Sequence, residues 1–398
     1  MIPEYPMTRA ERCPFDPPPA LRELREEGPI GKVRIWDGST AWMVTGYAQQ
    51  RALLADPRVS ADINRPGYPG FGPRAETGVT SVSFILMDDP EHARLRRMVT
   101  GPFAVRRVEE MRPGVQRIVD ELIDAMLAGP NPVDLVEAFA LPVPSLVICQ
   151  LLGVPYRDHD FFQANSKQLI RRTTSPEERG EAFGRLKAYL DDLIDRKLAE
   201  PGADLLSRLT GLIERGELTR DGAAEMGVLL LIAGHETTAN MIALGTLALL
   251  ENPEQLAALR GSGDPALIAN AVEELLRYLN ITHNGRRRVA TEDIPLDGQL
   301  IRAGDGIILA NDVGNRDAEV FENPDQLEVR REGARRHVAF GFGVHQCLGQ
   351  NLARMELQVA YGTLYRRMPT LALATPLSEI PFKHDGAVYG VYELPVRW

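Results

Sequence analysis

Cysteine and positive charge are both scarce in this sequence. Its three cysteines, Cys13, Cys149 and Cys347, are too few for a disulfide framework and cannot supply the four thiolates of an iron–sulfur cluster. There are 45 lysines and arginines against 55 acidic residues, which gives a formal net charge of -10. This balance argues against nucleic acid or an anionic membrane surface as the main partner, although it is compatible with local basic patches.

A basic stretch followed by an apolar run is also missing from residues 1–31, which are rich in proline and charge. We therefore expect neither a secretory signal nor a membrane anchor. The remaining composition, 44% hydrophobic and 25% charged, is that of an ordinary soluble globular protein. No internal repeat and no run of like charge marks a linker. These observations predict a soluble, cytoplasmic protein in a reducing compartment.

Hydrophobic periodicity predicts a mostly helical chain. The longest predicted helix covers residues 219–251 and is closed by Pro253. It is apolar nearly all round, which suits a buried core helix or a membrane span, and the ionisable residues at its centre favour the core. Alternating apolar residues predict a β-hairpin at 31–45 and further strands at 294–311 and 382–396. We expect the last strands to join the same small sheet as the hairpin.

Cys347 stands in an unusual setting. Gly341 and Gly343 permit a tight turn before it, and apolar residues recur at helical spacing after it. Cys347 therefore lies where a loop meets a helix, and the positive end of a helix favours the thiolate, which is the form that binds metal. A thiolate held by a glycine-rich loop suits an axial position of a haem iron. A lone cysteine is otherwise most simply a buried core residue, and we interpret Cys149 in this way.

Residues 340–349, Phe-Gly-Phe-Gly-Val-His-Gln-Cys-Leu-Gly, closely resemble the haem-ligand loop of the cytochrome P450 family. The resemblance implies that Cys347 is the axial ligand of heme b, iron protoporphyrin IX. It further implies that Phe340 shields the sulfur and that Gly341, like the next glycine, lets the loop pass close to the haem. His345 would meet a haem propionate.

A second match surrounds His92. The sequence Asp-Pro-Glu at 89–91 predicts a helix start, which places His92 and Arg96 on one helix face. Alone, such a pair is typical of a solvated helix surface. Together with the Cys347 loop, it resembles the family's His-x-x-x-Arg helix, whose side chains bind the propionates; an arginine fork suits a carboxylate. Arg288 matches a third propionate contact, and Arg287 remains an alternative because the register is uncertain by one residue.

The middle of the long helix interrupts its apolar pattern with Gly-His-Glu-Thr-Thr at 234–238. Such interruptions tend to mark function or strain, and the alternative is a buried, satisfied polar cluster. Together with Ala233, the segment resembles the family's oxygen-binding groove, where Ala233 would border the cofactor. The positions of Glu236 and Thr237 route protons to dioxygen in that family. A hydroxyl can hold a water molecule, and a carboxylate can relay protons from solvent.

Glu274 and Arg277 are three residues apart on a predicted helix, which alone indicates an ordinary salt bridge. The pair also resembles the family's buried Glu-x-x-Arg, which a later arginine completes. Arg331 is the candidate for that third place. We assign these three residues to stability around the haem rather than to chemistry.

The four motifs occur in the family's order along the whole chain. The implied fold is a single triangular domain, residues 1–398, mostly α with a small β region and with the haem between the long central helix and the Cys347 helix. A loop at 64–84, rich in glycine and proline, would cap the substrate pocket. The residues expected to contact substrate are Phe84, Leu231, Ile232, Ile281 and Thr282.

The implied activity is monooxygenation, in which one atom of dioxygen enters a small organic substrate. The chain looks most like the soluble actinomycete members that hydroxylate macrolides, other secondary metabolites and xenobiotics. The chain has no dinucleotide-binding fingerprint, so we expect electrons from a separate ferredoxin and reductase, docked near Cys347 at Arg97 and Arg354. We expect a monomer. The alternatives are a peroxide-driven peroxygenase, which Glu236 and Thr237 disfavour, and a non-catalytic thiolate-haem sensing protein.

Overall fold

The structure of the protein is a computed structural model that describes residues 2–10, 13–72, 84–170 and 174–398. The described residues fall into two compact units. The sheet unit comprises those within Met1–Glu76, Phe84–Arg94 and Ala269–Leu348, and the helical unit comprises those within Leu95–Ile268 and Gly349–Trp398. The organisation as a single domain stays a prediction. Residues 73–83 of the predicted substrate loop lie outside the described residues.

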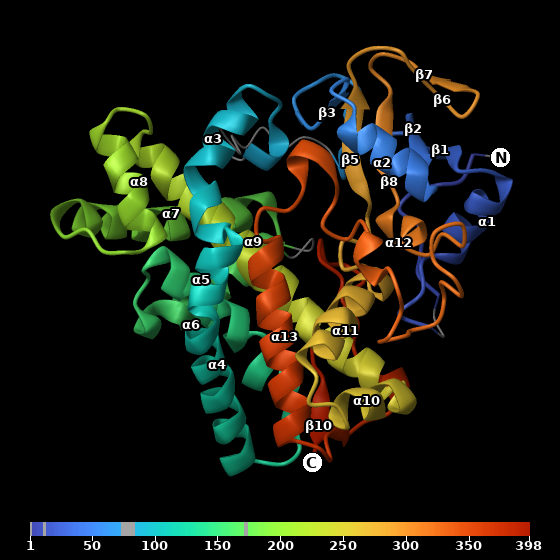
Figure 1. Ribbon diagram of the computed structural model, residues 1–398. Coiled ribbons are helices and arrows are strands. Elements are labelled where there is room, and N and C mark those ends of the chain that lie inside the picture. The colour runs from blue at the N-terminus through green and yellow to red at the C-terminus, as the bar shows by residue number, and fades with distance from the viewer. Residues whose placement is uncertain (1, 11–12, 73–83, 171–173) are drawn as a thin grey trace. The chain divides into compact units, whose positions relative to one another are not determined.

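The sheet unit is built on a five-stranded sheet with the strand order β1-β2-β8-β5-β3. The predicted hairpin is confirmed as β1 and β2, whose register pairs Ile30 with Val44. β2 and β8 run parallel, and the other neighbours run antiparallel. The strands are β1 (Ile30–Arg34), β2 (Thr40–Val44), β3 (Val59–Ser60), β5 (Arg286–Ala290) and β8 (Gly306–Leu309), beside a hairpin of β6 (Ile294–Leu296) and β7 (Gln299–Ile301) (Figure 1). The helices are α1 (Pro19–Glu27), α2 (Tyr47–Ala55), α12 (Asn311–Gly314), the first residues of α3 (Glu91–Thr100) and most of α11 (Pro265–Tyr278).

Apolar side chains cover both faces of this sheet, because neighbouring residues of a strand point to opposite faces. Met43 and Ile308 belong to one buried cluster. Trp42 and Ile307, their neighbours in sequence, belong to another. All four residues of β8 are buried, as expected for a strand covered on both faces. The same alternation decides which arginines of β5 share a face.

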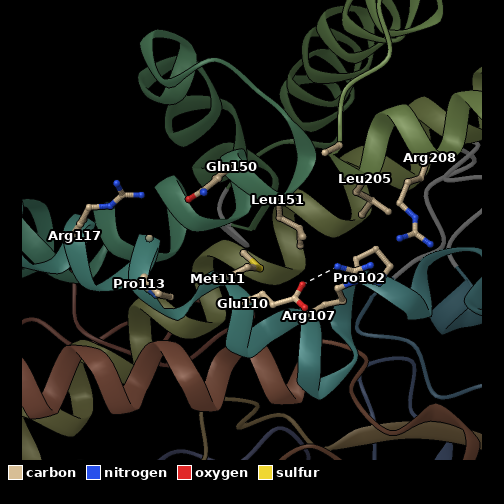
Figure 2. A pocket seen from close by; sticks show the side chains of 12 residues that line it. Pro102, Arg107, Glu110, Met111, Pro113, Arg117, Gln150, Leu151, Leu205 and Arg208 are labelled. Carbon is tan, nitrogen blue, oxygen red and sulfur yellow. Dashed lines mark hydrogen bonds and ion pairs between the residues drawn. The ribbon is translucent and has the colours of Figure 1, made fainter.

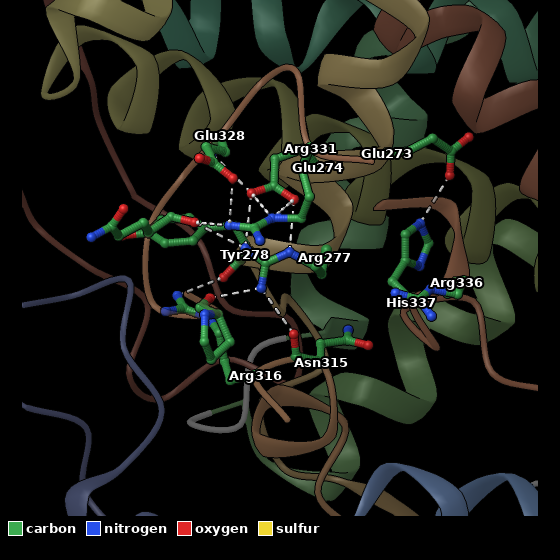
Figure 3. A network of polar contacts seen from close by, with 12 residues as sticks. Glu273, Glu274, Arg277, Tyr278, Asn315, Arg316, Glu328, Arg331, Arg336 and His337 are labelled. Carbon is green, nitrogen blue, oxygen red and sulfur yellow. Dashed lines mark hydrogen bonds and ion pairs between the residues drawn. The ribbon is translucent and has the colours of Figure 1, made fainter. Parts of the chain in front are cut away.

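A buried charge network ties α11 to the chain that precedes the Cys347 loop (Figure 3). Glu274 accepts from Arg277 Nε at 2.7 Å and Nη2 at 2.8 Å. Arg331 Nε adds contacts of 3.0 and 3.1 Å to the same carboxylate. The predicted group of Glu274, Arg277 and Arg331 is therefore confirmed. The neighbouring Glu273 has its Oε2 3.0 Å from Nε2 of His337, three residues before the Cys347 loop.

The helical unit consists of helices and a three-stranded sheet with the order β4-β10-β9. Its helices are α4 (Val105–Ala128), α5 (Pro142–Leu152), α6 (His159–Ile170), α7 (Pro176–Ala199), α8 (Leu205–Glu214), α9 (Arg220–Leu250), α10 (Pro253–Arg260) and α13 (Gln350–Arg367). Its strands are β4 (Val133–Asp134), β9 (Ala372–Leu373) and β10 (Pro395–Arg397). α9 is the central helix of this unit, since α5, α7, α8 and α13 all pack against it (Figure 1).

α9 confirms the predicted long helix. Its 31 residues span roughly 46 Å at 1.5 Å per residue. The Thr219 side chain caps its start by accepting from Gly222 N–H at 3.0 Å. By length and composition α9 could cross a membrane, but 72% of its most apolar window is buried inside the protein. Such burial is expected of a helix in the core of a protein.

The C-terminal tail departs from the prediction. We expected residues 382–396 to form strands of the hairpin's sheet, but β10 pairs with β4 and β9 instead. Phe382 and Val391 form an isolated bridge. The predicted sheet partner was therefore wrong. Alternation decides which side chains share a face, whereas the partner strand depends on contacts between distant parts of the chain.

Candidate active site

The Cys347 loop is folded by its own backbone. Cys347 N–H donates to Phe340 O at 2.8 Å, which closes the loop. Gly341 and Gly343 have φ angles of +74° and +72°, which favour glycine. A Cβ at Gly343 would lie 2.2 Å from the carbonyl oxygen of Leu54. Backbone geometry thus explains both glycines, and Cys347 is half-buried three residues before α13.

Two arginines of β5 share the sheet face that carries this loop. Arg286 Nη2 donates to Ala339 O at 2.7 Å. Arg288 lies on the same face, two residues further along the strand. Arg287 points to the opposite face, where its Cζ lies 3.5 Å from the centroid of the Phe71 ring. The arrangement favours Arg288 over Arg287 as the propionate contact.

The rings of His92 and His345, which come from two different motifs, lie 4.0 Å apart between centroids. His92 is buried on α3, and its Nδ1 lies 2.9 Å from Asp89 Oδ1. The structure therefore brings these two predicted propionate contacts together in the sheet unit. Arg96 follows His92 by one turn on α3 and belongs to the helical unit.

Arg286 and Arg288 on β5 are half-buried, and their surroundings shift the pKa of both. Burial and the neighbouring Arg288 lower the pKa of Arg286 to about 10, while Cys347 acts in the opposite direction. Burial also lowers the pKa of Arg288, against the opposing influence of Tyr68 and Asp88. A lowered pKa means that the surroundings disfavour the cation, so an anion bound here would stabilise both side chains.

Ala233 and Thr237 share one face of α9, one turn apart. Thr237 Oγ1 donates to Ala233 O at 2.8 Å. Within the described structure Ala233 is exposed and Thr237 is half-buried, so this face is open. Because the hydroxyl proton is bonded within the helix, the Thr237 oxygen can accept from a donor on the open side.

Glu236 points into the helical unit, where its side chain is only 11% exposed. Its Oε1 accepts from Asn240 Nδ2 at 3.0 Å and from Lys383 Nζ at 2.8 Å. The alternative of a satisfied polar cluster therefore describes the surroundings of Glu236, whereas Thr237 lies beside the exposed Ala233 on another face of α9. The acid and the alcohol are neighbours in sequence with different environments.

The predicted substrate contacts are divided between the two units. Phe84, Ile281 and Thr282 belong to the sheet unit, where Phe84 is buried and the other two are half-buried. Leu231 and Ile232 belong to α9 in the helical unit. Leu231 is 1% exposed, so Ile232, which is half-buried, offers more open surface.

Comparison with known proteins identifies the family. A family model described as Cytochrome P450 matches residues 21–369. Cytochrome P450 GfsF of Streptomyces halstedii is 58% identical over 398 residues, which cover 100% of this chain and 96% of GfsF. This chain belongs to the cytochrome P450 family.

Solved structures and other relatives agree with this assignment. The crystal structure of GfsF matches with a TM-score of 0.95 and 57% identity, and the match covers 100% of both chains. Mycinamicin VIII C21 methyl hydroxylase MycCI from Micromonospora griseorubida, bound to mycinamicin VIII, matches with a TM-score of 0.92 and 42% identity over 100% of both chains. Pentalenic acid synthase of Streptomyces avermitilis is 51% identical over 99% of this chain and 97% of its own. The predicted cytochrome P450 fold is confirmed, and the protein is a haem monooxygenase.

The cytochrome P450 family implies a haem with a cysteine thiolate ligand. The residues of the sheet unit fit such a group. His92 Nε2 and Arg286 Nε are buried and find no hydrogen-bond partner among the described residues. Haem propionates are anions that can accept from such donors and offset the positive charge of the half-buried Arg286 and Arg288.

Sequence reasoning missed two residues that interact with predicted site residues, Arg286 with Cys347 and Lys383 with Glu236. Arg286 could have been found from the period-2 alternation of a strand, since it lies two residues before Arg288. Lys383 carries no local signal, because 147 positions separate it from Glu236. Lys383 comes close to Glu236 only because the C-terminal tail folds back against α9.

A cavity of about 480 Å³ opens elsewhere on the helical unit, among α4, α5 and the start of α8 (Figure 2). Its lining includes Arg107, Glu110, Arg117 and Arg208, and Arg107 Nη1 pairs with Glu110 Oε2 at 2.7 Å. Sites for apolar ligands are lined mainly by apolar side chains. No motif residue contributes to the described lining, so we assign no substrate to this cavity.

Proposed function

We propose that the site residues perform the roles that the family motifs give them. Cys347 binds the iron of heme b, with Phe340 and Gly341 beside its sulfur and Ala233 against the ring. His92, Arg96, Arg288 and His345 bind the propionates. The observation that carries the proposal is the loop closed from Cys347 N–H to Phe340 O, because it holds one thiol at a fixed place beside the β5 arginines.

The bound haem supplies the redox chemistry of dioxygen, and the chain supplies binding, orientation and protons. Thr237 accepts a hydrogen bond from a donor in the open groove and orients it. Glu236 exchanges protons with solvent and passes them toward Thr237. Both side chains are on α9, whose burial keeps them at fixed positions.

We propose that the substrate is a secondary metabolite of the macrolide class. The support is the match to MycCI, which is bound to mycinamicin VIII, over the full length of both chains. The contacts expected to decide its fit are Phe84, Leu231, Ile232, Ile281 and Thr282. The protein acts in the cytoplasm as a monomer.

The test is a panel of macrolides, terpenoids and xenobiotics added to the haem-loaded protein. A macrolide is expected to shift the haem spectrum at low concentration. With ferredoxin, reductase and labelled dioxygen, the product should be heavier by one labelled oxygen atom. Equal turnover on peroxide alone would favour a peroxygenase, and binding without any product would favour a sensing role.

We propose that a ferredoxin delivers the electrons at a surface containing Arg97 and Arg354. Arg97 is exposed on α3, and Arg354 is half-buried on α13, where its Nη1 donates to Gln350 Oε1 at 2.9 Å. Opposite charges accelerate association and make it sensitive to salt.

The double variant Arg97→Gln/Arg354→Gln should slow reduction by ferredoxin roughly tenfold at low ionic strength, within the range by which charge steers association. Its rate should also depend less on salt. Arg157→Gln, at an exposed arginine elsewhere, is the matched control and should leave both unchanged. Stopped-flow reduction measures these rates, and equal salt dependence in the wild type and the double variant would contradict the docking surface.

A further inference from the structure

Lys383 reaches the proposed proton-delivery residue from the C-terminal tail. Its Nζ lies 2.8 Å from Glu236 Oε1, and the two side chains are 15% and 11% exposed. The same oxygen accepts from Asn240 Nδ2, which also donates to the backbone carbonyl of Glu236 at 2.7 Å. The carboxylate is thus held toward the tail by a cation and an amide.

A loop of the C-terminal tail places Lys383 beside α9. Lys383 N–H donates to Gly390 O at 2.8 Å, which closes a loop. A Cβ at Gly390 would lie 1.7 Å from Asn240 Oδ1, so the loop backbone lies directly against α9. On the outer side, the Tyr392 ring lies 5.7 Å from Lys383 Nζ, and Tyr392 donates to Asp385 Oδ1 at 2.7 Å. Lys383 therefore stands between a partly exposed loop and the buried carboxylate.

Burial alone would raise the pKa of Glu236, but Lys383, His235 and Asn240 together hold it below its ordinary value. Burial lowers the pKa of His235 itself to about 4, so this ring is neutral near pH 7. Lys383 is then the full positive charge that keeps Glu236 ionised at that pH. An ionised carboxylate can deliver a proton only after it has taken one up.

We propose that Lys383 is a positioning residue for proton delivery: it holds Glu236 ionised and turned toward the tail, and opening of this ion pair admits a proton to the carboxylate. The inference rests on the proposed role of Glu236. The carboxylate takes one proton from water at the tail, becomes a carboxylic acid and gives that proton up on the Thr237 side. The restored carboxylate pairs again with Lys383, which stays an ammonium throughout.

Lys383→Met removes the charge and keeps the length of the side chain. Without the cation, burial dominates and the pKa of Glu236 rises, so the carboxyl should be protonated near pH 7. Burial raises the pKa of Glu356 to about 8, so the wild type already holds one protonated carboxyl near pH 7. The infrared difference spectrum between haem-loaded Lys383→Met and the wild type, both without substrate, should show the C=O stretch of one further protonated carboxyl. This band should disappear in Lys383→Met/Glu236→Gln and should not appear in Lys383→Arg.

Turnover gives a second readout. A weaker acid donates more slowly, so kcat of Lys383→Met should fall roughly tenfold, less than the ~10²-fold that a positioned acid contributes, with KM unchanged. Its kcat should also gain a pH-dependent limb near neutrality, which Lys383→Arg restores to the wild-type profile. Lys32→Met makes the same chemical change at an exposed lysine and should alter neither the band nor kcat.

A Lys383→Met spectrum without the band, or a band that persists in the double variant, would overturn the inference. If Lys383→Met does not fold, the infrared difference spectrum between the wild type and Glu236→Gln still tests the inference. A band of protonated Glu236 in the wild type near pH 7 would contradict it. If the band appears as expected but Glu236→Gln turns over normally, control of the carboxylate by Lys383 stands and the proposed role of Glu236 fails.

Discussion

Glu274→Gln is expected to lower the free energy of unfolding by about 3–5 kcal/mol, the loss that follows when one partner of a buried ion pair is removed. Glu274 and Arg277 have fully buried side chains, and that of Arg331 is 4% exposed. Glutamine keeps the shape of the side chain but leaves the buried Arg277 guanidinium without its counter-charge and Arg331 with only the half-exposed Glu328. Since domains are stable by only about 5–15 kcal/mol, much of the variant should be unfolded or aggregated.

Guanidinium-induced unfolding of the haem-loaded protein, followed by circular dichroism, measures this loss. Glu328→Gln is the matched control, because its carboxylate also pairs with Arg331, at 3.3 Å, but is 48% exposed. Exposed pairs contribute about 0–1 kcal/mol, so the control should unfold close to the wild-type midpoint. If both variants lost the same free energy of unfolding, the buried carboxylate of Glu274 would stabilise the protein no more than the exposed carboxylate of Glu328.

The sequence predicted what depends on local spacing. Glu274 and Arg277 meet because they are three residues apart on a helix, and α9 lies within one residue of its predicted ends because a cap and a proline bracket it. The positive φ angles of Gly341 and Gly343 bear out the predicted tight turn. In each case the interacting groups are close in the chain.

What the sequence left open depends on distant parts of the chain. The choice between Arg287 and Arg288 needs the face on which β5 packs, and that face is decided by β8 and the Cys347 loop. The partner of β10 was predicted wrongly for the same reason. Lys383 was missed because its contact with Glu236 exists only once the tail has folded against α9. The contact between Lys383 and Glu236 therefore needed the structure, whereas the tight turn before Cys347 did not.

Cys347→Ala should abolish ferredoxin-driven oxygenation and leave the fold intact. The loop around it is closed by the backbone bond from residue 347 to Phe340 O, which alanine also makes. The half-buried thiol of Cys347 leaves little empty space when its sulfur is removed. The carbonyl complex of the reduced variant should lose the band position of a thiolate ligand, and product formation should fall below detection while circular dichroism stays that of the wild type.

Cys149→Ala is the matched control, because it makes the same change at a cysteine that cannot take over as ligand. Cys149 is 2% exposed on α5, and burial raises the pKa of its thiol to about 12, so it stays a neutral thiol. Burial and Asp16 also raise the pKa of Cys13. Cys149→Ala should lose about 1 kcal/mol of stability, as a small core truncation does, and keep the thiolate spectrum and the activity. A thiolate spectrum retained by Cys347→Ala, or lost in Cys149→Ala, would assign the ligand to another sulfur and remove the basis of the proposed site.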